Sequence, residues 1–195
     1  MKKLMLEYAY VKPFREDLNP YRIKTAFNFY MNDLKPLIAE AGQQLEGPHG
    51  LNTHTTSVVF RGIDYALHIG CNPIPVVFAC AFHDMARNND NVDQGHGQRA
   101  IPMATKIMKK FPYLLDSDAC FSILYAILNH SNGLFAKDCI SSCLWDADRT
   151  RMAWQHGYNE RFFNTNRGRY VAQHYRKYLE FQQSVFPNIQ WSRQY

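Results

Sequence analysis

One stretch of the chain, PIPVVFACAFHDMAR, is almost wholly apolar and then ends in two adjacent ionisable residues, His83 and Asp84. Pro73 and Pro75 suit the first turn of a helix, and the apolar residues after them predict a helix that is buried on all sides. Burying a carboxylate there has a large free-energy cost unless a cation compensates its charge. A bound metal ion is the simplest compensation, so we expect the fold to place this doublet at a metal site.

Further histidines and carboxylates that could bind the same ion lie on both sides of the doublet. His54 stands near the start of a helix predicted over residues 51–69, one turn before Val58, so its side chain would project from the buried face. Mixed imidazole and carboxylate ligands without cysteine are typical of catalytic transition-metal sites. The downstream candidates are His96, His130, Asp146 and Asp148. Together these residues indicate a metal-dependent hydrolase.

Two of the candidates, Asp146 and Asp148, compete for one place in the site. They are two residues apart on a predicted helix, so their side chains point about 200° away from each other. Asp148 flanks the buried face of this helix slightly more closely than Asp146. That face carries Ile140, Cys143, Leu144 and Ala147. We predict Asp148 as the ligand, with Asp146 as the alternative or as a hydrogen-bond partner of a ligand histidine.

The order of these residues resembles the HD superfamily of metal-dependent phosphohydrolases. The pattern of that family is a helical histidine, a later His-Asp doublet and a distant aspartate, which match His54, His83 with Asp84, and Asp148 in the step Ala-Asp-Arg. The resemblance covers roughly residues 49–152. In relatives with two metal ions, further histidines after the doublet complete the second ion. His96 and His130 match those histidines in order.

The resemblance implies an all-α fold, a compact helical bundle of the HD-domain type, with one or two divalent transition-metal ions at its centre. Imidazole and carboxylate ligands suit Mn, Fe, Co, Ni or Zn, so the sequence does not select the ion. His83 and Asp84 would also be the catalytic residues. The implied metal ligands are His54, His83, Asp84, His96, His130 and Asp148.

The chain is expected to form a single HD-like domain over residues 1–195, because no interior linker divides it. Its core would span about residues 17–155, with an N-terminal arm and a C-terminal helix packed on it. Residues 1–16 show no periodicity and would form this arm or a short strand. Helical spacing predicts helices over residues 18–42 with a bend at Pro36, 51–69, 75–87, 119–131 with a cap at Asp118, and 171–186, and one after His96.

Charge and apolar patterning limit the partners that we expect. The net charge of +5 and the pI near 8.9 favour anionic partners, but Lys and Arg are scattered and form no basic strip that would predict nucleic-acid binding. No run of about 18 apolar residues occurs, so we expect no membrane span and place the protein in the cytoplasm. The five cysteines are an odd number without a CxxC pair, which argues against a disulfide framework or a zinc ribbon.

The predicted function is hydrolysis of a nucleotide or another small phosphoester through a metal-bound hydroxide. Two alternatives stay open. A diiron oxygenase with the HD fold requires both His96 and His130 to bind iron, and a non-catalytic regulatory module would bind metal without turnover. His49, in the loop before residues 51–69, could also reach the site. The basic residues that could bind a substrate phosphate are Arg87, Arg99, Lys106 and Arg149.

Overall fold

The computed structural model of the chain describes residues 20–42, 47–189 and 191, and these residues form helices and turns without a strand. The predicted all-α fold is confirmed. π-helical segments precede two of the helices, at Tyr30–Leu34 and Leu51–Thr55, and a 3-10 turn spans Glu160–Phe162. The helices are α1 (Pro20–Phe29), α2 (Lys35–Ala41), α3 (Thr56–Ile69), α4 (Pro73–Phe82), α5 (His96–Met108), α6 (Ser117–Asn129), α7 (Cys139–His156), α8 (Asn166–Gln173) and α9 (Tyr175–Val185).

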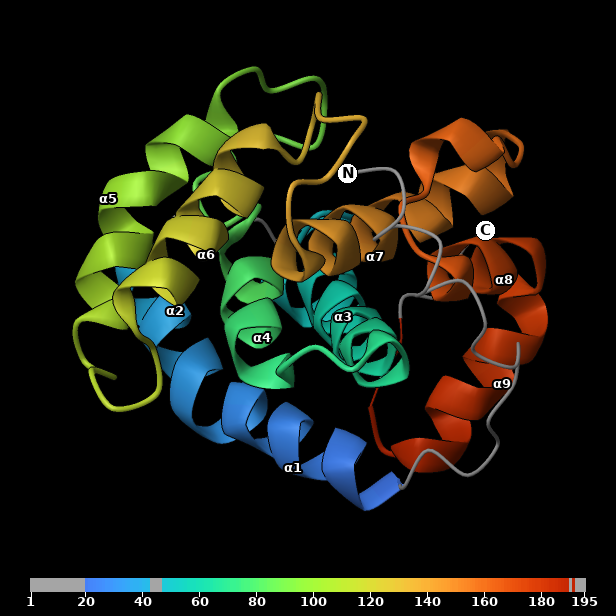
Figure 1. Cartoon of the computed structure of the whole chain (residues 1–195), viewed down its shortest axis with the longest axis horizontal. Coiled ribbons are helices and arrows are strands. Elements are labelled where there is room, and N and C mark those ends of the chain that lie inside the picture. The colour runs from blue at the N-terminus through green and yellow to red at the C-terminus, as the bar shows by residue number, and fades with distance from the viewer. Residues whose placement is uncertain (1–19, 43–46, 190, 192–195) are drawn as a thin grey trace, which may run out of the picture.

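α3 and α4 form the centre of the bundle, and the other helices surround them (Figure 1). α4 packs on α3, α6 and α7, and α1 packs on both central helices. The composition of α4 explains its place, because its residues from Pro75 to Phe82 are all buried. A helix that is apolar all round is stable only where other elements cover it on every side. The predicted burial of this helix is therefore confirmed.

The helix predicted over residues 18–42 is present as one continuous helical run of α1, the π-helical segment and α2, and Pro36 stands in the first turn of α2. Two features of the later helices differ from the predicted ones for local reasons. Asp116, and not Asp118, caps α6, because its extended backbone lets its side chain accept a hydrogen bond from the N–H of Ala119 at 2.7 Å. The C-terminal helix is divided at His174 into α8 and α9.

A buried ion pair attaches the C-terminal helices to the bundle. Nε of Arg167 on α8 lies 2.9 Å from Oδ2 of Asp64 on α3, and its NH2 lies 3.2 Å from Oδ1. Nδ1 of His68 lies 3.1 Å from the same carboxylate. α8 packs on α3 and α7, and α9 packs on α7, at the right of Figure 1. The arm predicted for residues 1–16 lies outside the described residues.

One disulfide joins Cys71, in the turn between α3 and α4, to Cys139, the first residue of α7. The sequence does not predict this pair, because the two cysteines are 68 positions apart and meet only in the fold. Disulfides are commoner in oxidising compartments than in the cytoplasm, so the cytoplasmic location stays a prediction. The free cysteines among the described residues are Cys80, Cys120 and Cys143.

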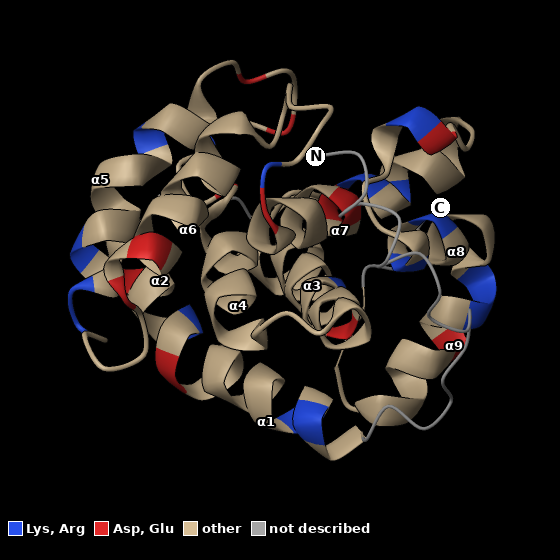
Figure 2. Cartoon of the chain, viewed as in Figure 1, with Lys and Arg blue, Asp and Glu red and all other residues tan. Residues whose placement is uncertain are grey.

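Charged residues lie mainly on the outer helices. Figure 2 shows Lys and Arg spread over α1, α5, α7, α8 and α9, with acidic segments between them. Within the described ranges, no helix is both long and apolar enough to cross a membrane.

Candidate metal centre

Four histidines meet where the ends of four helices come together. His54 lies in the π-helical turn before α3, His83 follows α4, His96 begins α5 and His130 follows α6. None of the four is more than 5% exposed. Nε2 of His54 lies 3.2 Å from Nε2 of His83, and Nε2 of His96 lies 2.7 Å from Nε2 of His130. The imidazoles therefore form two pairs.

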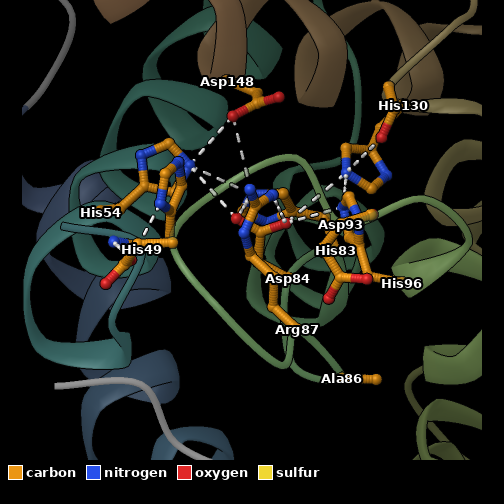
Figure 3. Close-up of polar contacts among 12 residues, drawn as sticks. His49, His54, His83, Asp84, Ala86, Arg87, Asp93, His96, His130 and Asp148 are labelled. Carbon is orange, nitrogen blue, oxygen red and sulfur yellow. Dashed lines mark hydrogen bonds and ion pairs between the residues drawn. The ribbon is translucent and has the colours of Figure 1, made fainter. Parts of the chain in front are cut away.

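The carboxylate of Asp84 joins the two pairs. Its Oδ2 lies 3.4 Å from Nε2 of His83 and 3.8 Å from Nε2 of His54. Its Oδ1 lies 3.0 Å from Nε2 of His96 and 3.6 Å from Nε2 of His130. Figure 3 shows Asp84 between His54 on one side and His96 and His130 on the other. We call His54, His83 and Asp84 the first ligand group, and Asp84, His96 and His130 the second ligand group.

Hydrogen bonds to the backbone leave the Nε2 atoms of three rings available to a cation. Nδ1 of His83, His96 and His130 each donates to the carbonyl of the residue three positions earlier, at 2.8, 2.5 and 2.7 Å. Because a carbonyl can only accept, Nδ1 carries the proton, and a neutral ring then has its lone pair on Nε2.

This arrangement fits a divalent metal ion. In the second ligand group two Nε2 lone pairs face each other, with Oδ1 of Asp84 beside them. That oxygen is buried, and among the described residues it accepts no hydrogen bond of normal geometry. A cation bound by these three atoms would accept an electron pair from each of them. Without a cation, three negatively polarised atoms lie in contact and repel one another.

The structure separates the two aspartates of α7. Oδ1 of Asp148 lies 2.9 Å from Nε2 of His54 and 3.6 Å from Nε2 of His83, beside the first ligand group. Asp146 accepts four hydrogen bonds from backbone and side-chain donors of the two residues before α8. The geometry thus brings Asp148, the preferred candidate, to the histidines, while Asp146 fixes the start of α8. The donors to Asp146 belong to Asn164 and Thr165.

The ionisation of the side chains follows from this geometry. Burial alone would raise the pKa of Asp84, but the imidazole of His83 and the neighbouring rings hold that pKa well below its usual value. The pKa of Asp148 is also held well below its usual value against the effect of burial, because its carboxylate faces His54 and His83. Burial raises the pKa of Asp146, since its partners are uncharged. The centre therefore presents two negative charges to a cation.

The pKa of His83 shows what a cation would replace. Burial lowers this pKa, but the carboxylates of Asp84 and Asp148 outweigh burial and raise it to about 9. Without metal, His83 therefore holds a second proton at neutral pH. A bound cation takes the place of that proton, since a metal ligand must offer its lone pair.

Two residues that sequence reasoning did not single out fix the backbone around the centre. Arg61 on α3 is fully buried, and its Nε donates to the carbonyl of Ala147 at 2.7 Å, directly before Asp148. A Cβ on Gly97 would lie 2.5 Å from the carbonyl of Ile127, so α5 approaches the end of α6 only because this residue has no side chain. A basic residue within an apolar run is a sequence feature that could have identified Arg61, whereas no sequence feature distinguishes Gly97.

Arg87 is the basic candidate whose guanidinium lies beside a ligand carboxylate. Its NH1 is 3.6 Å from Oδ1 of Asp84. Its Nε and NH2 donate to the carbonyls of Asn89 and Asn91, at 3.0 and 2.6 Å, in the loop after the doublet. These bonds hold the guanidinium beside the centre.

The other basic candidates contact different parts of the fold. Arg99 and Arg149 donate hydrogen bonds to backbone carbonyls, and Arg99 also donates to one carboxylate. Lys106 is in the last turn of α5, at the opposite end of that helix from His96. The acceptors of Arg99 are Ala86, Gln94 and Asp93, and those of Arg149 are His130, Gly133 and Phe162.

His49 lies beside the first ligand group and is held by a carboxylate. The centroid of its ring is 5.5 Å from that of His54. Its backbone N–H and its Nδ1 both bond to Oδ1 of Asp90 at 3.0 Å, which ties the loop before α3 to the loop after the doublet. The side chain is 29% exposed. His49 therefore lies between the centre and the solvent, on the His54 side of Figure 3.

A comparison with solved structures identifies the fold. The chain is similar to the crystal structure of a predicted HD superfamily hydrolase from an uncultured Thermotogales bacterium, with a TM-score of 0.59. The chain has the HD-domain fold. The match covers 81% of this chain and 92% of that chain at 22% sequence identity. The two HD-domain folds are therefore similar well beyond the ligand groups. No protein-family model matches the sequence, and no curated protein matches it.

Proposed function

We propose that the chain is a metal-dependent phosphohydrolase that acts on a nucleotide or another small phosphoester. The observation that supports this most is the pair of ligand groups that share Asp84. His54, His83, Asp84 and Asp148 would hold one ion, and Asp84, His96 and His130 a second. A divalent ion in such a site lowers the pKa of a coordinated water and neutralises phosphoryl oxygens as they gain charge.

The chain's own side chains supply positioning and charge around the ions. Arg87 is the basic residue best placed to bind a phosphate oxygen, because its guanidinium is held next to Asp84 by two loop carbonyls. A fixed cation contributes to phosphoryl transfer where charge develops in the transition state. His49, oriented by Asp90 at the border with solvent, is the candidate for proton transfer to the leaving group.

One observation favours a second candidate, an HD-fold diiron oxygenase. That activity needs two irons, and therefore both His96 and His130, and the structure brings both rings to Oδ1 of Asp84. Imidazole and carboxylate ligands also suit iron. Two irons per purified chain together with oxygen uptake would support the oxygenase and contradict the phosphohydrolase.

The first prediction tests the phosphohydrolase directly. Metal-stripped protein is assayed against a panel of nucleotides and a generic aryl phosphate, with each divalent ion restored in turn. We expect turnover only with metal. In the variants Asp84→Asn and His83→Gln we expect kcat to fall at least about 100-fold, because both remove a ligand atom while keeping the approximate size of the side chain.

Residues of the same types outside the centre provide the matched controls. His68→Gln and Asp146→Asn replace a histidine and an aspartate that contact Asp64 and the start of α8, so both should retain metal-dependent turnover. Protein that binds ions tightly and hydrolyses no substrate in the panel would contradict the proposal and would favour the regulatory module. Turnover that survives complete removal of metal would contradict it as well.

A further inference from the structure

The second ligand group depends on a turn that follows α6. His130 is the first residue after that helix, and its Nδ1 donates to the carbonyl of Ile127. The N–H of Gly133 then closes the turn on the carbonyl of Asn129 at 2.7 Å. The last carbonyls of a helix have no partner within the helix, so the position of this turn relies on other contacts.

Arg149 on α7 supplies these contacts. Its NH2 donates to the carbonyl of His130 at 3.0 Å and also to the carbonyl of Gly133. Its NH1 donates to the carbonyl of Phe162 at 3.2 Å. A guanidinium carries five donors in a planar fork, and here it binds three carbonyls from two loops at once. A lysine ammonium at the same place could not span these acceptors.

Trp145, one turn before Arg149, packs against the same turn. Its Nε1 donates to the carbonyl of Ala126 on α6 at 3.0 Å. Gly133 lies against the indole ring, with no room for a Cβ. The guanidinium carbon of Arg149 lies 5.5 Å from the centroid of the Trp145 ring. α7 therefore holds both the end of α6 and the turn that carries His130.

The residue before Arg149 serves the other ligand group. Asp148 lies beside His54 and His83, whereas Arg149 contacts the backbone of His130. Adjacent helical side chains point about 100° apart, which lets one step of α7 contact both groups. A change at position 149 should consequently affect the second group and leave the first in place.

We propose that Arg149 is a positioning residue that keeps His130 in place for a metal ion in the second ligand group. The inference rests on the proposed function, because it concerns how the ions are held. It replaces the phosphate-binding role that the sequence indicates for Arg149. To bind a substrate, the guanidinium would have to leave three carbonyls, and the turn with His130 would lose its attachment to α7.

The test is Co²⁺ binding to the metal-free full chain, followed by calorimetric titration, by metal content after dialysis and by visible absorption. We expect two Co²⁺ per wild-type chain. Arg149→Met should keep one Co²⁺ with wild-type affinity and bind the second about 10–100-fold more weakly, as for other residues that orient a ligand. Arg149→Lys should restore at most part of this loss, because an ammonium cannot reach all three carbonyls.

Arg169→Met is the matched control. NH2 of Arg169 donates to the carbonyl of Phe163 at 2.9 Å, next to the carbonyl that Arg149 binds, and the hydrogen bonds of Arg169 do not include His130. This variant removes a guanidinium that binds a carbonyl of the same loop, and it should still bind two Co²⁺. Thermal melting of each variant shows whether it folds. If Arg149→Met does not fold, Co²⁺ binding is measured on Arg149→Lys instead.

Three results would overturn the inference. The first is two Co²⁺ bound to Arg149→Met with wild-type affinities. The second is equal weakening of both ions, which indicates a general structural role. The third is a raised KM with both ions retained, which indicates substrate binding. A wild-type chain that binds no ion contradicts the proposed function itself, and one that binds a single ion contradicts this inference alone.

Discussion

At the residue scale, the centre is built by repeating one local contact. Three histidines stand at or next to a helix end, and each donates Nδ1–H to the carbonyl three positions earlier. The acceptors for His83 and His130 are carbonyls in the last turn of a helix, and the acceptor for His96 is a loop carbonyl, so all three are available. The contact fixes both the rotation of the ring and the nitrogen that carries the proton. His54 is the exception, because its buried Nδ1 has no partner within the described residues.

The two aspartates of α7 give a second prediction, also at this scale. Asp148→Asn should weaken metal binding at least about tenfold, because it removes a charged oxygen 2.9 Å from Nε2 of His54. Asp146→Asn should keep metal binding and lower the free energy of unfolding by about 1–3 kcal/mol, since one of its buried hydrogen-bond acceptors becomes a donor. Metal titration and urea unfolding of both variants measure the two effects. The reverse result would make Asp146 the ligand.

At the scale of elements, helix ends make the centre, and a buried ion pair attaches α8 to α3. Arg167 and Asp64 are both buried, and two hydrogen bonds join them. Removing one partner of such a pair leaves an uncompensated charge in the interior. Attachment of the C-terminal helices to the bundle therefore depends on both charges.

This pair gives a prediction about pH. Burial alone would raise the pKa of Asp64, but His68 and Arg167 lower it below the ordinary 3.8. A lowered folded-state pKa means that the ionised carboxylate stabilises the fold above the pKa of the unfolded chain. That contribution is lost as the pH falls below about 4 towards the folded value. In urea unfolding, the stability gap between wild type and Asp64→Asn should narrow as the pH falls below about 4.

An exposed pair that involves α8 provides the comparison. Nε of Arg169 lies 3.4 Å from Oε1 of Glu160, and the Glu160 side chain is 72% exposed. Glu160→Gln should change the free energy of unfolding by less than about 1 kcal/mol. Arg167→Met should cost about 3–5 kcal/mol, because it leaves Asp64 buried and charged. Equal effects of these two substitutions would contradict the role given to the buried pair.

At the scale of the whole molecule, the candidate ligands come from the ends of α3, α4, α5 and α6 and from the middle of α7. The fold brings imidazoles and two carboxylates together there, and Oδ1 of Asp84 accepts no hydrogen bond of normal geometry from the described residues. A cation that binds only this folded arrangement should stabilise the entire bundle, because five helices share it.

Metal removal is therefore expected to lower the melting temperature. At a free ion concentration of about 100 times Kd, binding adds about 2.7 kcal/mol, which corresponds to about 5–10 °C for a chain of this size. Thermal melting after chelation, and again after Co²⁺ or Mn²⁺ is restored, measures the change. His83→Gln should show a smaller rise on metal addition. A melting temperature that does not respond to any divalent ion would contradict a metal at the centre.

Much of the fold and several site residues are predictable because their causes are local. The apolar run of α4 predicts a buried helix, and the ionisable doublet at its end predicts compensation by a cation. Helical periodicity places His54 on a buried face. Periodicity favours Asp148 over Asp146 only narrowly, and the resemblance to the HD superfamily supports the same choice. The cap of α6 and the division at His174 depend on backbone angles that residue types alone do not specify.

Residue types and periodicity in the sequence thus determined the buried central helix and the kinds of ligand atom that the centre contains, and the resemblance to the HD superfamily implied the all-α class. Only the tertiary structure decided which atoms meet: the sharing of Asp84 by two ligand groups, the contact of Asp148 with His54 across 94 positions, and the use of Arg149 on the His130 turn. The physical reason is that such contacts depend on how helix ends converge. Local sequence patterns predict which residues of each helix are buried, but they do not specify the directions in which separate helices pack.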